Sequence, residues 1–492
     1  MTSAALPSRD EEARLTTARP LASSPGGRDR PGPPTSAGTP MSSPSTASTP
    51  VVDPAASFPA TAPLPVATQR PPWRHTFIAL SVPNFRLWTV GNFVAMTAGW
   101  MQRIAQDWLV LELTGSATAV GVTVAMQFAP MLFFGLLGGV LVDRFSKRAL
   151  MVVTQSVFAV LSIGLAVLTL TGVVEAWHVF AIAFATGLVT VVDNPARQVI
   201  VSELVGQRHL RNAISVNSSV FQLGGMIGPA VSGVLLLAVG AGWAFAVNGV
   251  ACLLVVGMLG LLRTSQMTRT APAPRSRGQL REGLAYARAK PTILVPVVLV
   301  ASYAVFGLTM PVLLASYADE VFDVGAGGYG LFNSMIAVGA LTGALLSTRR
   351  ATIRLRTLVV GLLVTGLLQA GAGIVGGAAG VVPFALVLVS VGLASLLFLT
   401  SANQLVQLSS NIGIRGRVMS LYVLVLLGGQ AVGGPLMGGI VELLGTPAAM
   451  VISGGVPAVV AGVTALVLAR RGQLTLQMRV RRHLPVVEIA AR

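Results

Sequence analysis

One apolar stretch of the sequence carries an arginine and an aspartate four residues apart, Arg103 and Asp107. On a helix this spacing puts both side chains on one face, with Gln102 and Gln106 beside them. Because a charge at membrane depth costs at least a few kcal/mol, we expect both charges to face an internal cavity and to pair. Asp107 is therefore the candidate for proton exchange, with Arg103 as the partner that holds it ionised in one state. A permanent structural ion pair is the alternative.

A second charged motif, Gly139-Val140-Leu141-Val142-Asp143-Arg144-Phe145-Ser146-Lys147-Arg148, follows the next apolar stretch. The small Gly139 lets two helices approach closely. Asp143 at a membrane boundary needs a cation or a helix N-terminus to stabilise its charge. A basic loop that only fixes the topology is the alternative interpretation.

Two glycine-proline motifs occur at the same place in two halves of the chain. The first contains Gly224, Gly228, Pro229 and Gly233, and the second contains Gly434, Pro435, Gly438 and Gly439. Glycines at this spacing make a smooth helix face, and proline kinks the helix where a packed neighbour covers the freed carbonyl. Adding 206 to the number also turns Gln198 into Gln404 and Arg211 into Arg417, which predicts two equivalent halves related by an axis along the membrane normal. Plain small-residue packing is the alternative for the motifs.

The elements that position these residues are predicted to be twelve membrane-spanning helices, because apolar stretches of about 18–25 residues recur along the chain. Threaded as alternating spans, they put every lysine and arginine except Arg103 on one side, while the opposite connections carry only acids, such as Glu112 and Glu442. This bias predicts that both termini are cytoplasmic. The predicted spans are 87–111, 118–141, 149–171, 178–199, 213–239, 243–262, 292–318, 329–346, 358–374, 382–408, 418–444 and 448–469.

The composition supports a membrane protein, because 53% of the residues are hydrophobic and only 10% are charged. The net charge of +17 comes in short clusters at span ends, which argues against nucleic acid and for contact with an anionic lipid bilayer. The lone Cys252 excludes an intramolecular disulfide, and no metal site or cofactor is expected. The predicted regions are a disordered cytoplasmic tail (1–75), a six-helix bundle (76–263), a cytoplasmic linker with a short amphipathic piece near 279–288 (264–290), a second six-helix bundle (291–470) and a cytoplasmic C-terminal tail (471–492).

The loop from Gly139 to Arg148 resembles the signature loop of the major facilitator superfamily, Gly-x-x-x-Asp-Arg-x-Gly-Arg-Arg/Lys, with Ser146 in place of the usual glycine. The motif around Pro229 resembles the antiporter motif of the same superfamily, which is more typical of exporters than of importers. The strings from Trp100 to Leu109 and from Asp193 to Gln198 narrow the resemblance to the bacterial branch of macrolide-efflux proteins and the enterobactin exporter. The resemblance covers roughly residues 84–470.

The resemblance implies a conformational latch and a central cavity. In the superfamily the signature loop bridges to the start of span 11, here Arg415-Gly416-Arg417, and an acid at the inner end of span 4 joins the cluster. Asp193 is then expected to pair with Arg144, and Asp143 with span 11. The expected latch residues are Gly139, Asp143, Arg144, Arg148, Asp193, Arg197 and Arg417. The expected cavity residues, from spans 1, 4, 7 and 10, are Gln102, Gln106, Thr186, Thr190, Tyr303, Asn403 and Gln404, although each hydroxyl has a bond to its own helix backbone as the alternative.

Together these features predict an all-α major facilitator fold in the bacterial inner membrane that exports a hydrophobic or amphipathic small molecule in exchange for protons, as a monomer. No phosphate-binding loop and no catalytic triad is visible, so no enzyme is expected. Two alternatives stay open: an importer of a small metabolite on the same fold, and a non-transporting membrane sensor or scaffold.

Overall fold

The computed structural model describes residues 78–267, 279–347, 354–411, 414–470, 475–481 and 484–490. The chain separates into two units, Met1–Phe58 and Pro59–Arg492, and every described residue belongs to the second. The predicted N-terminal tail lies outside the described residues, as do residues 268–278 of the predicted linker and parts of the C-terminal tail.

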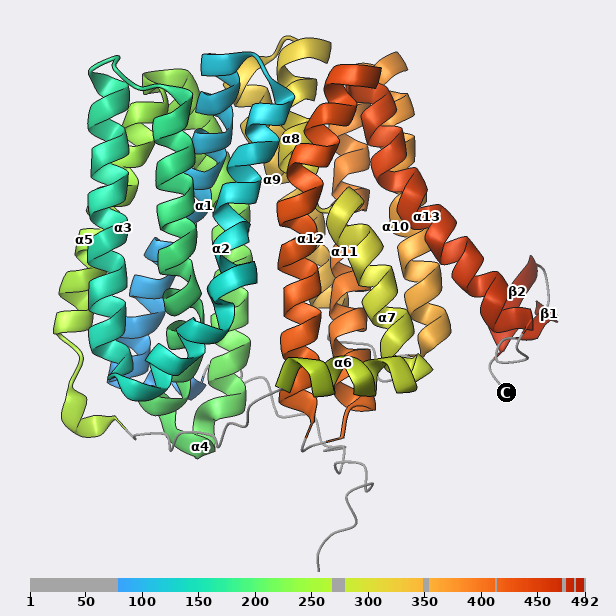
Figure 1. Cartoon of the computed structure of the whole chain (residues 1–492), viewed down its shortest axis with the longest axis horizontal. Helices are drawn as coiled ribbons and strands as arrows, with labels where there is room; N and C mark the ends of the chain where they lie inside the picture. Colours follow the sequence, from blue (N-terminus) through green and yellow to red (C-terminus); the bar gives the residue numbers. More distant parts are fainter. Residues whose placement is uncertain are drawn as a thin grey trace, which may run out of the picture. The chain divides into compact units, whose positions relative to one another are not determined.

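The described chain is almost entirely helical, as predicted, apart from one short hairpin at its end (Figure 1). The first half contains η2 (Ile78–Ser81), α1 (Pro83–Thr114), α2 (Ala117–Arg144), α3 (Lys147–Leu170), α4 (Ala176–Val239), α5 (Ala241–Gly260) and η3 (Thr264–Gln266). The second half contains α6 (Gln279–Ala289), α7 (Pro291–Ser302), η4 (Tyr303–Gly307), α8 (Met310–Ser316), η5 (Tyr317–Val321), α9 (Gly325–Ser347), α10 (Leu355–Ala378), α11 (Val381–Ser409), α12 (Arg415–Leu444) and α13 (Thr446–Arg470).

Among the described residues, eleven helical segments are long and apolar enough to cross a membrane. Two of them lie within α4, which breaks at Gly206, where φ is 64°. A third runs from Pro291 to Val321 through α7, η4, α8 and η5. Helix α1 occupies the place of the first predicted span and is less apolar, because it contains Arg103 and Asp107. The predicted membrane-spanning fold is confirmed, with these eleven segments and α1 in the positions of the twelve predicted spans.

Each half of the chain forms its own helical bundle, and the two bundles pack against each other. In the first half α1 packs on α4 and α5, and α3 packs on α5. In the second half α10 packs on α13, and α9 packs on α11. The halves contact each other mainly through α2 against α12 and α4 against α9. Helix α6 lies across the ends of α7 and α12, as Figure 1 shows, at the place of the predicted amphipathic piece.

The connections on one side of the bundle are tight turns. Each contains a glycine with positive φ, a conformation that other residues rarely adopt. These glycines are Gly115, Gly172, Gly240, Gly325, Gly380 and Gly445. We call this side of the molecule the Gly115 side and the opposite side, which carries the α2–α3 connection, the Asp143 side.

The C-terminal residues form an antiparallel hairpin that the sequence did not predict. Strand β1 (Thr475–Arg481) pairs with β2 (Leu484–Ala490), and the register joins Arg481 to Leu484.

Candidate functional site

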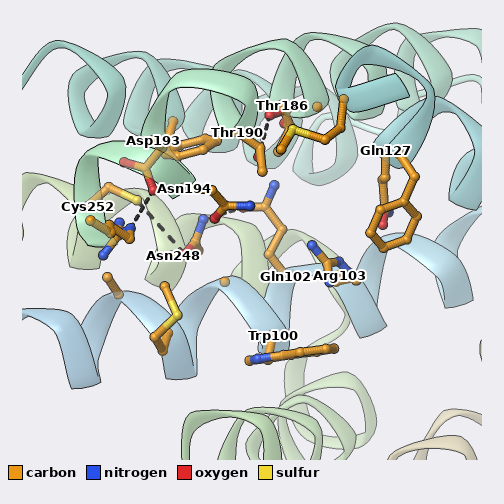
Figure 2. Close-up of a pocket in the computed structure, with 18 of the residues that line it drawn as sticks. Trp100, Gln102, Arg103, Gln127, Thr186, Thr190, Asp193, Asn194, Asn248 and Cys252 are labelled. Atoms are coloured by element: carbon orange, nitrogen blue, oxygen red, sulfur yellow. Dashed lines mark hydrogen bonds and ion pairs between the residues drawn. The ribbon is translucent and has the colours of Figure 1, made fainter. Parts of the chain in front are cut away.

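A cavity of about 340 Å3 is lined mainly by helices of the first half, and two residues of α12, Leu427 and Gln430, also line it. Figure 2 shows part of this lining. Its charged lining residues are Arg103, Asp193 and Arg197. The remaining lining residues are Ala95, Met96, Gly99, Trp100, Gln102, Gln106, Gln127, Phe128, Met131, Gln155, Phe158, Thr186, Gly187, Thr190, Asn194, Phe221, Asn248 and Cys252. Four of the seven expected cavity residues, Gln102, Gln106, Thr186 and Thr190, therefore line it.

The Arg103 side chain lies over two aromatic rings of the cavity wall. Its guanidinium carbon is 4.9 Å from the centroid of the Trp100 ring and 5.4 Å from that of Phe128. Trp100 in turn meets the ring of Phe221 edge-on, with centroids 6.1 Å apart. Within the described part of the chain, Arg103 makes neither an ion pair nor a hydrogen bond. The expected direct pair with Asp107 is therefore not formed in this structure.

Two further polar side chains of the cavity wall lack hydrogen-bond partners among the described residues. Both amide atoms of Gln127 are buried and have no hydrogen-bond partner, and the same holds for Oγ1 of Thr186. Thr190 instead donates to the Thr186 carbonyl of its own helix, at 2.8 Å. Because buried polar groups are normally hydrogen-bonded, Gln127 and Thr186 are places where a ligand can supply the partner.

The two glutamines of α1 are held by the helices around them. Oε1 of Gln102 accepts hydrogen bonds from Ser162, at 2.5 Å, and from Asn248. Nε2 of Gln106 donates to the Val179 carbonyl at 3.4 Å. These bonds connect α1 with α3, α4 and α5, so both glutamines also stabilise the first half.

Asp107 is fully buried but is not among the residues that line the cavity. Its Oδ2 accepts a hydrogen bond from the Tyr329 hydroxyl of α9, at 3.3 Å. Its Oδ1 has no partner among the described residues. The Tyr329 ring stacks on Trp108, with centroids 6.0 Å apart. Asp107 therefore lies at a contact between the two halves.

Asp193 and Arg197 form the centre of a buried network inside the first half. Arg197 donates through Nε to Asp193 and through Nη1 to Asn92, at 2.7 Å. Asp193 also accepts from Thr154, at 2.7 Å, and from Gln155, at 3.2 Å. The partner of Asp193 is thus Arg197, four residues along the same helix, where the sequence had suggested Arg144. The network ties α4 to α1 and α3.

The other expected latch residues lie on the Asp143 side. Gly139, Asp143 and Arg144 belong to the last two turns of α2, and Arg417 belongs to the first turn of α12. Arg148 donates to the carbonyls of Leu259 and Gly260, at 2.7 Å each, and so caps the end of α5. A latch between Asp143 and α12 stays a prediction.

The glycines of the first motif make two kinds of close contact. A Cβ placed on Gly228 would lie 2.6 Å from Cβ of Trp100, and one on Gly224 would lie 2.7 Å from Cβ of Met96. These two glycines therefore hold α4 against α1. Gly233 faces Gly330 of α9, whose Cα would lie 2.9 Å from an added Cβ. The end of the motif is thus a contact between the halves.

The second motif packs α12 against α2. A Cβ on Gly434 would lie 2.5 Å from the Gly121 carbonyl oxygen, and one on Gly438 would lie 2.6 Å from that of Ala117. Gly439 has open space around it. The partner Gly121 has no other glycine within five residues in the sequence, and Gly330 ends the glycine-rich run 325–330, which was not recognised as a contact site.

Three expected cavity residues of the second half do not line the cavity. Tyr303 is buried, shares a hydrogen bond of 2.5 Å with Ser395 and packs edge-on against Phe398. Asn403 accepts from Gln407 at 2.6 Å, and Gln404 is exposed. Among the described residues there is also no group of three or more His, Cys, Asp or Glu side chains that can hold a metal ion.

Comparisons with known proteins agree with this arrangement. The family model for transmembrane secretion effectors matches residues 74–491. The enterobactin exporter EntS of Escherichia coli O6:K15:H31 is 25% identical over 401 residues, which cover 78% of this chain and 92% of the exporter. The multidrug efflux pump Tap of Mycolicibacterium fortuitum is 26% identical over 410 residues, which cover 78% of this chain and 96% of the pump.

Solved structures share the fold at low sequence identity. A POT family transporter in complex with 5-aminolevulinic acid has a TM-score of 0.65 at 14% identity, covering 79% of this chain and 96% of the transporter. An inward-facing bacterial homolog of the human lysosomal transporter Spinster has a TM-score of 0.59 at 17% identity, covering 82% of this chain and 98% of the homolog.

Proposed function

We propose, from the chain's membership of the transmembrane secretion effector family of major facilitator efflux transporters, that it exports an amphipathic small molecule in exchange for protons. The observation that carries the proposal is the cavity of about 340 Å3 between α1, α2, α4 and α12, which combines aromatic walls with unpartnered polar groups. Ligand pockets have this character, mostly apolar with a few polar groups that orient the ligand.

The contacts between the halves support alternating access. On the Gly115 side, Glu442 of α12 accepts hydrogen bonds from Ser116, at 2.5 Å, and from the Thr118 backbone, at 3.1 Å. The close approaches of Gly434 to Gly121 and of Gly233 to Gly330 lie on the same side. We infer that the Gly115 side is the closed outer side in this structure and that the cavity exchanges its ligand with the cytoplasm. Rocking of the halves breaks these contacts and exposes the cavity to the outside.

Proton exchange is assigned to Asp107. A carboxyl group couples protons to transport when its partners differ between two states of the protein. Tyr329 reaches Asp107 only while α9 packs against α1, whereas Arg103, one turn along α1, stays with it in every state. Separation of the halves therefore removes the hydrogen bond from Tyr329 and leaves the charge of Arg103 one turn away. The Asp143 loop is assigned the complementary role of a latch for the state with the Asp143 side closed.

We also infer the membrane in which the protein lies, the bacterial inner membrane, and its orientation there. We infer that both termini and the basic connections face the cytoplasm of a bacterial cell, because basic residues of the described connections, such as Arg144, Lys147 and Arg417, lie on the Asp143 side. All of the residues needed to line the cavity come from one chain, and we infer that a monomer is sufficient for transport.

Transport in reconstituted vesicles tests the proposal. Purified protein in liposomes is given a panel of fluorescent amphipathic substrates and an imposed proton gradient. We expect substrate movement opposite to the proton gradient, which stops when an ionophore collapses the gradient. Movement in the same direction as the protons would support the importer instead, and no gradient-dependent movement of any substrate would contradict the function.

A further inference from the structure

Arg103 is a cation with aromatic neighbours and, among the described residues, no ion-pair partner. The cation–π contacts with Trp100 and Phe128 stabilise the guanidinium only in part, since a charge removed from water normally requires a charged partner. Asp107 lies one turn along α1 but forms no ion pair with Arg103, and Asp193 lines the same cavity; both carboxylates accept hydrogen bonds from other side chains. Asp107 accepts from Tyr329, and Asp193 pairs with Arg197.

A ligand in the cavity can supply the hydrogen-bonded anionic partner that Arg103 lacks among the described residues. Gln127 adds a buried amide with both of its polar atoms unpartnered and an exposed fraction of only 7%. Thr186 adds a buried hydroxyl without a partner. All three residues line the same cavity, and Figure 2 shows Arg103 with Gln127 and Trp100 around one end of it. The cavity thus has donors for an anion in place before any ligand is bound.

The charge balance of the lining favours an anion over a cation. Arg103 and Arg197 are accompanied by one carboxylate, Asp193, which already accepts hydrogen bonds from Arg197, Thr154 and Gln155. A cationic ligand would find no free carboxylate among the lining residues and would meet the charge of Arg103. An anionic ligand would neutralise that charge, and a guanidinium binds a planar carboxylate through two parallel hydrogen bonds.

The walls next to Arg103 suit a flat ring. Trp100, Phe128 and Phe221 present aromatic surfaces, and Met96 and Met131 add flexible apolar side chains that adapt to ligand shape. A volume of about 340 Å3 is at the lower end of the range that ligand pockets occupy. The cavity therefore fits a small ring system with one polar end.

We propose that this cavity binds a small aromatic carboxylate, with the carboxylate on Arg103, Gln127 and Thr186 and the ring against Trp100 and Phe128. Gln127 donates through Nε2 to the carboxylate, and its Oε1 accepts from a donor group on the ring. This assignment rests on the proposed export function for its physiological meaning, and it names the class of molecule that the exporter takes.

Binding of three probes that share one ring tests the assignment. Naphthoate, naphthamide and naphthylmethylammonium have the same ring with a negative, neutral or positive end. Isothermal titration of each probe into the full-length protein in nanodiscs measures the dissociation constants. We expect naphthoate to bind about tenfold or more tightly than naphthamide, since a hydrogen bond to a charged group is worth more than a neutral one, and the ammonium to bind most weakly.

Variants connect the preference to the residues. Arg103→Gln is expected to remove the preference for naphthoate over naphthamide. Arg103→Lys keeps the positive charge but cannot form the bidentate hydrogen bonds of a guanidinium, so it is expected to retain part of this preference. Gln127→Leu is expected to weaken naphthoate several-fold and leaves Arg103 in place. Arg263→Gln is the matched control, because Arg263 is an exposed arginine outside the cavity. Thermal unfolding of each variant shows that it is folded.

The results separate this inference from the proposed function. Equal binding of the three probes, a preference for the ammonium, an unchanged preference in folded Arg103→Gln, or no binding of naphthoate would overturn the carboxylate site. A clear carboxylate preference without proton-dependent transport in vesicles would leave the site standing and contradict the export function. Proton-driven export of cationic substrates alone, with no carboxylate binding, would support the export function and overturn the carboxylate site.

Discussion

The hydroxyl of Tyr329 donates a hydrogen bond to Oδ2 of Asp107 over 3.3 Å and so joins α9 of the second half to α1 of the first. Both side chains are fully buried, and the second oxygen of the carboxyl group has no partner among the described residues. The charged or titratable groups that face Asp107 are Arg103, one turn away, and Tyr329 itself. A change in the protonation of Asp107 therefore acts on a contact that holds the halves together.

Replacing Asp107 is expected to separate proton coupling from ligand movement. Asp107→Asn keeps an acceptor for Tyr329 but no longer exchanges a proton. We expect it to abolish export driven by a proton gradient and to leave exchange of labelled for unlabelled substrate close to that of the unchanged protein. Both rates are measured in the same proteoliposomes. Gradient-driven export at the normal rate in Asp107→Asn would show that the coupling group lies elsewhere.

Removing the hydroxyl of Tyr329 tests the contact between the halves. Tyr329→Phe keeps the ring that stacks on Trp108 and loses a hydrogen bond of about 1 kcal/mol, so gradient-driven export is expected to change about fivefold. Tyr317→Phe is the control, because Tyr317 donates to the Gly373 carbonyl inside the second half, at 3.1 Å. If both variants change export equally, the effect belongs to hydroxyl loss in general and not to the contact with Asp107.

Two adjacent glycines of α12 provide a matched pair for the contact with α2. A Cβ on Gly438 would lie 2.6 Å from the Ala117 carbonyl oxygen and from Cα of Thr118, while Gly439 has nothing within 4 Å. Gly438→Ala is expected to destabilise the protein by about 1–3 kcal/mol, as overpacking does. Gly439→Ala is expected to be neutral or to stabilise by up to about 1 kcal/mol, because alanine favours the helix. Thermal unfolding in nanodiscs measures both, and equal midpoints would contradict the close packing.

The helical spans and the cavity-facing part of α1 were predictable because their signals are local. A run of apolar residues marks a span, and charges four residues apart, such as Arg103 and Asp107, mark one helix face. The tertiary partners were not predictable in this way. Tyr329 lies 222 residues from Asp107, and no pattern in the sequence connects them.

The predicted contacts between different helices depended on more than local sequence signals, and the structure shows other contacts at Asp193 and Tyr303. Asp193 finds its cation at Arg197, one turn along α4, because a partner on the same helix needs no second element to be positioned. The prediction of a cavity lined by spans 1, 4, 7 and 10 placed Tyr303 in it, but Ser395 and Phe398 hold Tyr303 inside the second half. Gln127 was missed because a single glutamine in an apolar span carries no spacing signal.

The Asp193–Arg197 pair yields a stability prediction with an internal control. The two side chains are 4% and 8% exposed, so removing one charge leaves the other buried without its partner. Asp193→Asn or Arg197→Met alone is expected to cost about 3–5 kcal/mol. The double variant removes both charges and is expected to be more stable than either single variant. Thermal unfolding midpoints test this order, and additive losses in the double variant would contradict a coupled buried pair.

Labelling of single cysteines tests the assignment of the Gly115 side to the outside. In a Cys252→Ala background, Ala379→Cys places an exposed thiol in the α10–α11 connection on the Gly115 side, and Thr264→Cys places one in η3 after α5, next to the basic linker. A membrane-impermeant maleimide added to intact cells is expected to label the first and not the second, while everted membrane vesicles are expected to give the opposite pattern. Because the maleimide does not cross the lipid bilayer, it labels only thiols on the side to which it is added, and the result reports orientation directly. Labelling of the Thr264→Cys variant in intact cells would invert the topology and, with it, the direction of transport inferred from the closed Gly115 side.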